Sequence, residues 1–207
     1  MPMSSKNSRK IYVSENYYHV YNRGVEKRPI FLDADDYAVF LNLLKRHLEK
    51  QSVKDKCGRQ YQNFHKDIEL LSYCLMPNHF HFLFYLHNNI SALPNLMRLV
   101  TNTYVNYFNR KYQRVGHLFQ DRFKASMVLR DDYLQHITRY IHLNPKSYLD
   151  YKWSSLPYYI GHQNADWIKP ERILTIFCNS EEYVKFLHDY SGYKDSLEEV
   201  KYELANY

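Results

Sequence analysis

The feature that most constrains the fold of this chain is an alternating run at residues 76–84, Met-Pro-Asn-His-Phe-His-Phe-Leu-Phe. Alternation with a period of two predicts a β-strand, in which side chains two residues apart point to the same face. His79 and His81 then project side by side from one face, while the phenylalanines that alternate with them point into a core. The strand is therefore expected inside a sheet that buries at least one of its faces.

Two neighbouring imidazoles on a rigid strand supply half of a divalent metal site, because histidine is the commonest metal ligand in proteins. The alternative is a pair of ordinary half-buried histidines. The cysteines offer no competing site, since Cys57, Cys74 and Cys178 have neither a disulfide framework nor a zinc-ribbon spacing. Their usage fits a reducing cytoplasm, which is the compartment that we expect.

Composition indicates one main domain with a polyanionic partner. The 207 residues are 45% hydrophobic, which is enough for a sizeable core, and no apolar run is long enough to predict a membrane span. The net charge is +6; residues 181–207 carry seven acidic and three basic side chains, a net −4, so the remaining 180 residues carry +10. A basic body with 22 tyrosines favours nucleic acid, whose bases stack on aromatic rings. A solvated basic surface without a specific partner is the alternative.

Hydrophobic periodicity divides the chain into a disordered basic leader at 1–14, a main domain at 15–165 and an acidic helical extension at 166–207. The main domain is predicted to contain, in order, a strand at 17–22, a helix from Asp33 to about Gln51, strands at 68–75 and 79–86, a helix capped by Ser91, a strand at 123–129, and a helix capped by Asp131 or Asp132 that Pro145 ends. This order predicts an α+β fold, a ferredoxin-like, RRM-like split βαβ with a central antiparallel sheet and helices on one face.

The last of these helices supplies the remaining candidate ligands. Tyr140 and Asn144 are four residues apart, so one helix face carries both. A helix packed across the histidine strand would bring them to the two imidazoles, where the amide oxygen of Asn144 adds a third ligand for Mg²⁺ or Mn²⁺. Taken alone, each residue has a plainer interpretation: Asn144 as a helix terminus and Tyr140 as a packing side chain.

Three further motifs accompany the histidine strand. They are Tyr-His-Val-Tyr-Asn-Arg-Gly at 18–24, Gly-His-Leu-Phe-Gln-Asp-Arg-Phe at 116–123 and Arg-Tyr-Ile-His-Leu-Asn-Pro at 139–145. Together with Met-Pro-Asn-His-Phe-His they resemble the REP-associated tyrosine transposases, domesticated relatives of the single-strand insertion-sequence transposases in the HUH endonuclease superfamily. The resemblance covers roughly residues 17–160.

The resemblance implies a fold, a mechanism and a substrate. By family, His79 and His81 are the metal-binding pair of an HUH nuclease fold, Tyr140 is the nucleophile and Asn144 is the third ligand. The substrate is single-stranded DNA beside a hairpin, and the product is a 5′-phosphotyrosine with a free 3′-hydroxyl. The chemistry is consistent with these roles, because a phenol is a weak nucleophile at pH 7 until activated, and a divalent ion on the phosphate neutralises developing charge.

The expected DNA-binding surface consists of basic residues near the motifs. They are Arg23, Lys27, Arg28, Arg98, Arg110, Arg114, Arg122 and Lys124. Each of these alone is equally well explained as a solvated surface charge, so only the cluster carries weight. The resemblance implies that insertion-sequence relatives exchange the tyrosine helix between subunits, but the short connection from 129 to 131 offers no long tether for such an exchange. We therefore expect a monomer, with a dimer as the alternative, associated with the bacterial nucleoid.

Two other functions stay open from the sequence. One is a nucleic-acid-binding module without catalysis, derived from a transposase, which the ferredoxin-like order also suits. A pure binder, however, has no need of His79, His81, Tyr140 and Asn144 together. The other is a metal-dependent phosphodiesterase that uses activated water, in which Tyr140 is incidental. A covalent protein–DNA product separates the transposase-like function from both.

Overall fold

The computed structural model describes residues 11–128 and 131–189. Most of the predicted leader, residues 1–10, and the acidic end, 190–207, lie outside them, as do the side chains of the predicted caps Asp131 and Asp132. The strands are β1 (Asn16–Arg23), β2 (Ile68–Met76), β3 (His79–Leu86) and β4 (Lys124–Val128). The helices are α1 (Ala34–Leu48), α2 (Ala92–Lys111), α3 (Asp131–His142), α4 (Leu156–Tyr159), α5 (Glu171–Leu174) and α6 (Ser180–His188), with short 3-10 helices η1 (Val25–Lys27) and η2 (Tyr148–Asp150).

The strands form a four-stranded antiparallel sheet in the order β2-β3-β1-β4. Each predicted strand has its counterpart within one residue at either end. The strand–helix–strand–strand–helix–strand order places β1 between β3 and β4, as a split βαβ fold requires. The predicted α+β fold class is thereby confirmed.

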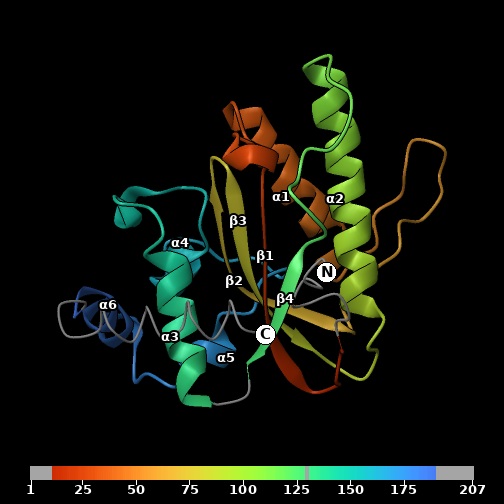
Figure 1. Cartoon of the computed structure of the whole chain (residues 1–207). Coiled ribbons are helices and arrows are strands. Elements are labelled where there is room, and N and C mark those ends of the chain that lie inside the picture. The colour runs from red at the N-terminus through yellow and green to blue at the C-terminus, as the bar shows by residue number, and fades with distance from the viewer. Residues whose placement is uncertain (1–10, 129–130, 190–207) are drawn as a thin grey trace, which may run out of the picture.

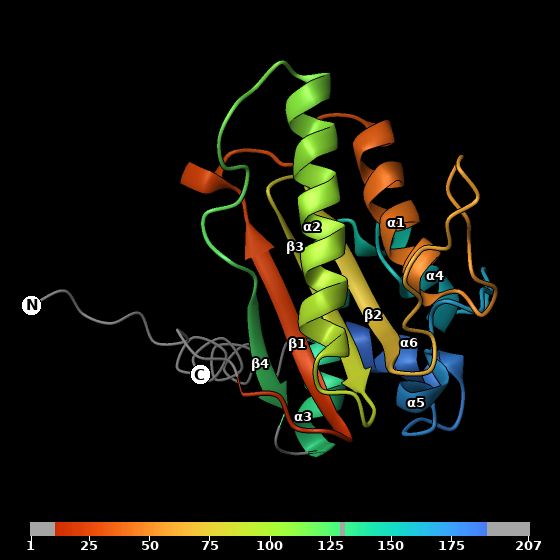
Figure 2. The same ribbon diagram turned by 90° about the vertical axis from the view of Figure 1, so that its right-hand side faces the viewer.

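Helices cover both faces of this sheet, whereas the sequence predicted them on one face (Figure 1, Figure 2). α1 and α2 lie against one face, and α3 crosses the other with α4, α5 and α6 beside it. The reason is that neighbouring residues of the central strands are apolar on both sides: Leu83 and Phe84 of β3 point to opposite faces, and both are fully buried. A sheet that is apolar on both faces has to be covered twice.

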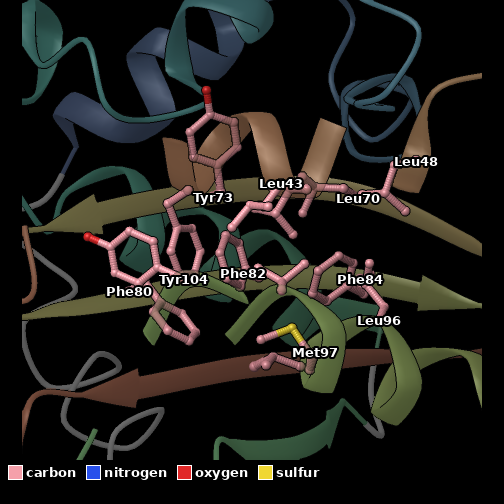
Figure 3. Close-up of a cluster of buried hydrophobic side chains, with 14 of the residues drawn as sticks. Leu43, Leu48, Leu70, Tyr73, Phe80, Phe82, Phe84, Leu96, Met97 and Tyr104 are labelled. Carbon is pink, nitrogen blue, oxygen red and sulfur yellow. The ribbon is translucent and has the colours of Figure 1, made fainter. Parts of the chain in front are cut away.

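The core between the sheet and the pair α1–α2 is rich in aromatic side chains (Figure 3). Phe80, Phe82 and Phe84 are completely buried there and pack with Met97 and Tyr104 of α2. Full burial of a phenylalanine contributes on the order of 1.5–3 kcal/mol to stability. The predicted direction of the phenylalanines is confirmed, which leaves the histidines of β3 on the opposite face, toward α3.

The two predicted helix caps have different outcomes. Asp33 caps α1, because its carboxylate accepts the backbone N–H of Asp36 over 3.1 Å. Ser91 precedes α2 as predicted, but makes no capping hydrogen bond; its hydroxyl donates to Oδ1 of Asn89 over 2.8 Å. Pro94 offers no N–H three residues on, and Ser91 has helical backbone angles (φ −82°, ψ −12°) in place of the extended ones that a capping residue adopts.

Gly24 follows β1 directly, where the chain meets the 77–78 turn and the 116–123 loop. Its N–H donates to the carbonyl of Asn78, and the next N–H, from Val25, donates to the carbonyl of Leu118. A Cβ on Gly24 would lie 2.2 Å from the carbonyl oxygen of Arg28, so only glycine fits. This junction fixes the 77–78 turn and the 116–123 loop beside β1.

The segment after residue 165 contributes to both cores. Trp167 and Ile168 join the core beneath α1, whereas Ile173 and Tyr183 join the core around α3. The predicted boundary near residue 165 stays a prediction. Within the described ranges, no helix has the length and apolarity that crossing a membrane requires.

Candidate active site

A cavity of about 380 Å³ opens where the ends of β1 and β3 meet α3. It brings together His79 and His81 from β3 with Tyr140 from α3, three residues that the sequence placed in one site. The other lining residues are Tyr21, Asn22, Arg23, Gln120, Asp121, Arg122 and Lys124. The site is thus a cavity with two phenols, two imidazoles, three cationic side chains and one carboxylate.

His79 lies between two amide side chains. Its Nδ1 donates to Oδ1 of Asn78 over 2.6 Å, and its Nε2 lies 3.1 Å from Oδ1 of Asn144. Both amide orientations are fixed, because the NH₂ of Asn78 donates to the carbonyl of Lys27 and that of Asn144 donates to the carbonyl of Tyr140. An oxygen therefore faces each ring nitrogen of His79.

This arrangement suits a cation. Burial lowers the pKa of His79, and the Asn144 contact, which acts in the opposite sense, does not reverse this shift, so the ring is neutral at pH 7 and carries one proton. With that proton on Nδ1, the lone pair of Nε2 faces a lone pair of Asn144 over 3.1 Å. Adjacent ligands on an octahedral ion with bonds of about 2.1 Å lie about 3 Å apart, so one ion can accept both pairs.

Asn144 reaches His79 from beyond the helix, which corrects the prediction that it shares a face of the helix with Tyr140. α3 ends at His142, two residues before Asn144. The residue before a proline avoids the helical conformation, and Pro145 follows. The amide nevertheless stays beside α3 because it donates back to the carbonyl of Tyr140 over 3.2 Å.

His81 hydrogen-bonds to a third histidine, His19, which the sequence analysis did not single out. Nε2 of His19, on β1, lies 2.9 Å from Nδ1 of His81, and the two ring planes are 3° apart. Burial lowers the pKa of His19 to about 3 and that of His81 well below its usual value, so both are neutral. The available signal was the alternation Tyr17, His19, Tyr21, which puts His19 on the face of β1 that continues the face of His81.

Tyr140 stands edge-on to these imidazoles. Its ring centroid lies 5.3 Å from that of His81 and 6.2 Å from that of His19, at interplanar angles of 84° and 86°. Tyr21 closes the same side, and burial followed by the neighbouring Tyr140 raises its pKa. The phenol of Tyr140 is half-buried and faces the cavity.

The helix that carries Tyr140 is fixed on its far side by buried polar contacts. His142 accepts from the hydroxyl of Tyr183 over 2.5 Å and donates to Ser155 Oγ over 2.7 Å. Arg139 is fully buried; its guanidinium donates to the carbonyl of Phe186 and lies 4.2 Å above that ring. These contacts tie α3 to α6 and to the segment before α4.

A second, larger cavity of about 890 Å³ lies beside the first, between α2 and the 116–123 loop. The two cavities share the residues Asn22, Gln120, Asp121 and Arg122. α2 contributes polar side chains to it, among them Arg98, Asn102 and Asn106. The two cavities therefore adjoin at one wall, and Tyr140 lines the smaller of them.

The structure separates the eight basic residues of the predicted DNA surface into two groups. Arg23, Arg98, Arg122 and Lys124 line one or both cavities. Lys27, Arg28, Arg110 and Arg114 line neither. Among these, Arg28 pairs with Glu26, and the guanidinium of Arg114 lies 5.7 Å above the ring of Phe108.

Comparison with known proteins gives one family match and two similar solved structures. A family model described as IS200-like transposase matches residues 12–144. The solved structure of a REP-associated tyrosine transposase bound to a REP hairpin aligns with a TM-score of 0.57 and 15% identity, covering 79% of this chain and 91% of that one. A Deinococcus radiodurans protein aligns with a TM-score of 0.39 and 12% identity over 65% of this chain and 95% of its own. No protein with a curated description matches the chain.

Proposed function

Because this chain belongs to the IS200-like transposase family, we propose that it nicks and rejoins single-stranded DNA through a covalent phosphotyrosine at Tyr140. The observation that carries the proposal is the 380 Å³ cavity, in which the Tyr140 phenol and the imidazoles of His79 and His81 face one space. A binding module without catalysis would not need a nucleophile and two metal-type ligands in one polar cavity.

We propose Mg²⁺ or Mn²⁺ as the cofactor, held by His79, His81 and Asn144. Among the described residues, no group of three or more His, Cys, Asp or Glu side chains is placed to hold a metal ion, so the proposed ligand set adds the amide of Asn144 to the two imidazoles. Such a set leaves coordination positions for water and phosphate oxygens, which both ions accept readily. When bound, the ion would polarise the scissile phosphate and neutralise charge that develops on its oxygens.

In the proposed reaction, the phenolic oxygen of Tyr140 forms a bond to phosphorus and the bond from phosphorus to the 3′-oxygen breaks. The phenol loses one proton and the departing 3′-oxygen gains one, so the step is balanced. Arg23, Arg122 and Lys124 face the same cavity and would hold the phosphate oxygens. The phosphotyrosine retains a phosphodiester, and attack by a 3′-hydroxyl reverses the step.

We propose that the single strand runs from the larger cavity to the smaller one. The shared wall of Asn22, Gln120, Asp121 and Arg122 joins the two, and the amide and guanidinium groups of α2 suit base edges and phosphates. The similarly folded transposase is bound to a REP hairpin, which supports hairpin-associated DNA as the substrate class here.

The test is a denaturing gel with labelled single-stranded hairpin oligonucleotides, Mn²⁺ or Mg²⁺, and EDTA as a parallel condition. We expect a metal-dependent covalent adduct with the wild type and with Tyr148→Phe, a tyrosine outside both cavities. Tyr140→Phe is expected to form none while it still binds the hairpin. Binding without any adduct would favour the non-catalytic module, and cleavage that survives Tyr140→Phe would favour hydrolysis by activated water.

A further inference from the structure

His19 is placed at the centre of the sheet, directly behind a proposed metal ligand. It lies on β1 opposite Leu83 of β3 and Ser126 of β4, and only 1% of its surface is exposed. Its Nε2 is 2.9 Å from Nδ1 of His81. Its Nδ1 is buried and has no hydrogen-bond partner in the described part of the chain.

An unpartnered buried nitrogen destabilises the fold, and an apolar ring at position 19 would avoid that cost. The contact with His81 is the one hydrogen bond that the structure assigns to the His19 ring within the described ranges. The hydrogen bond to His81 is therefore the contact that distinguishes a histidine at this position from an apolar ring.

The geometry allows two proton arrangements, because each neutral imidazole carries one N–H and only one of the two facing nitrogens can hold it. If Nδ1 of His81 donates to His19, Nε2 of His81 keeps its lone pair toward the cavity. If Nε2 of His19 donates instead, the proton of His81 sits on Nε2, which can then bind no metal ion. The second nitrogen of His81 is thus available only in the first arrangement.

We propose that His19 is a positioning residue that holds His81 in the Nδ1-protonated tautomer and so presents its Nε2 to the metal ion. The inference rests on the proposed metal site, and it adds a buried partner that fixes both the tautomer and the ring orientation of one ligand. Partners of this kind typically alter metal affinity by about 10–100-fold when removed.

The test compares His19→Gln, His19→Asn and His19→Phe in the full chain. A glutamine carbonyl reaches the position of Nε2 and accepts the same hydrogen bond, an asparagine is too short, and phenylalanine keeps only the ring. The matched control is His47→Gln, a buried histidine that hydrogen-bonds to the carbonyl of Gln62 and does not line the cavity. The readouts are Mn²⁺ affinity by electron paramagnetic resonance and the protonated nitrogen of His81 by nitrogen-15 NMR.

We expect His81 of the wild type to carry its proton on Nδ1. His19→Gln and the control should bind Mn²⁺ within about threefold of the wild type, and His19→Asn and His19→Phe about 10–100-fold more weakly. A wild-type His81 protonated on Nε2, or a His19→Phe variant with unchanged affinity, would overturn the proposal. If the wild type binds no Mn²⁺ and forms no Tyr140 adduct, the proposed function fails, while the nitrogen-15 signals still decide the tautomer.

Discussion

At the scale of single residues, Asn144 is the proposed ligand whose chemistry is easiest to alter without changing the fold. Its oxygen faces Nε2 of His79 over 3.1 Å, and its NH₂ holds the carbonyl of Tyr140. The residue lies outside α3 and is only half-buried, so a substitution there changes the donor set more than the packing.

We predict that Asn144→Ala weakens Mn²⁺ binding by about tenfold or more, since one of three protein ligands is lost. Asn144→Asp should restore or strengthen binding, because a carboxylate is a better ligand for a hard cation than an amide. Titration followed by electron paramagnetic resonance measures both, with the exposed Asn102→Ala of α2 as the control. Equal affinities in wild type and Asn144→Ala would remove Asn144 from the ligand set.

At the scale of elements, the position of Tyr140 depends on how α3 is held against the sheet. Ile137 and Ile141 are buried in the core around α3, while His142 bonds to Tyr183 of α6 and to Ser155, whose hydroxyl in turn donates to the backbone of β2. Burial lowers the pKa of His142 to about 3, so the ring is neutral; its two nitrogens accept from Tyr183 and donate to Ser155. The helix that carries Tyr140 is therefore held by apolar packing and by buried hydrogen bonds.

His142→Leu should destabilise the protein by about 2–4 kcal/mol, because the buried hydroxyl groups of Tyr183 and Ser155 each lose a hydrogen-bond partner. The same change should reduce adduct formation at Tyr140 more than hairpin binding, since the basic cavity walls come from other elements. Urea unfolding and the adduct gel measure the two effects, with His162→Leu on the exposed segment after α4 as the control. An unchanged midpoint of unfolding would show that the clamp contributes little.

At the scale of the whole molecule, the net charge is +6, but the basic side chains are unevenly placed on the structure. Four of the eight predicted DNA-binding residues line the two joined cavities, and the other four line neither. Arg98 and Arg110 form a matched pair, since both are exposed on α2 but only Arg98 lines a cavity.

The affinity for a single-stranded oligonucleotide falls as salt rises, and log affinity is linear in log salt concentration. We predict that Arg98→Ala makes this slope less steep by about 0.7, the value for one released phosphate counterion. Arg110→Ala should leave the slope unchanged. Fluorescence anisotropy between low and moderate salt measures both slopes. If both variants reduce the salt dependence equally, the proposed path of the strand along the cavities is contradicted, and the charge acts through the surface as a whole.

The expected monomer stays a prediction, as does its association with the nucleoid. Tyr140 lies beside the histidines of its own sheet, and the ring centroids of Tyr140 and His81 are 5.3 Å apart. The cavity therefore contains the phenol and both imidazoles without a contribution from a second copy.

The sequence alone determined the strands, the direction of the β3 side chains and the family, because a period of two and short motifs are local properties of the chain. The tertiary structure decided what depends on which strands are neighbours. Because β1 lies beside β3, His19 is within hydrogen-bond distance of His81. Because both faces of the sheet are apolar, α3 lies on the face opposite α1 and α2. Neither could be predicted locally, because strand order and face coverage are set by contacts between segments far apart in the chain.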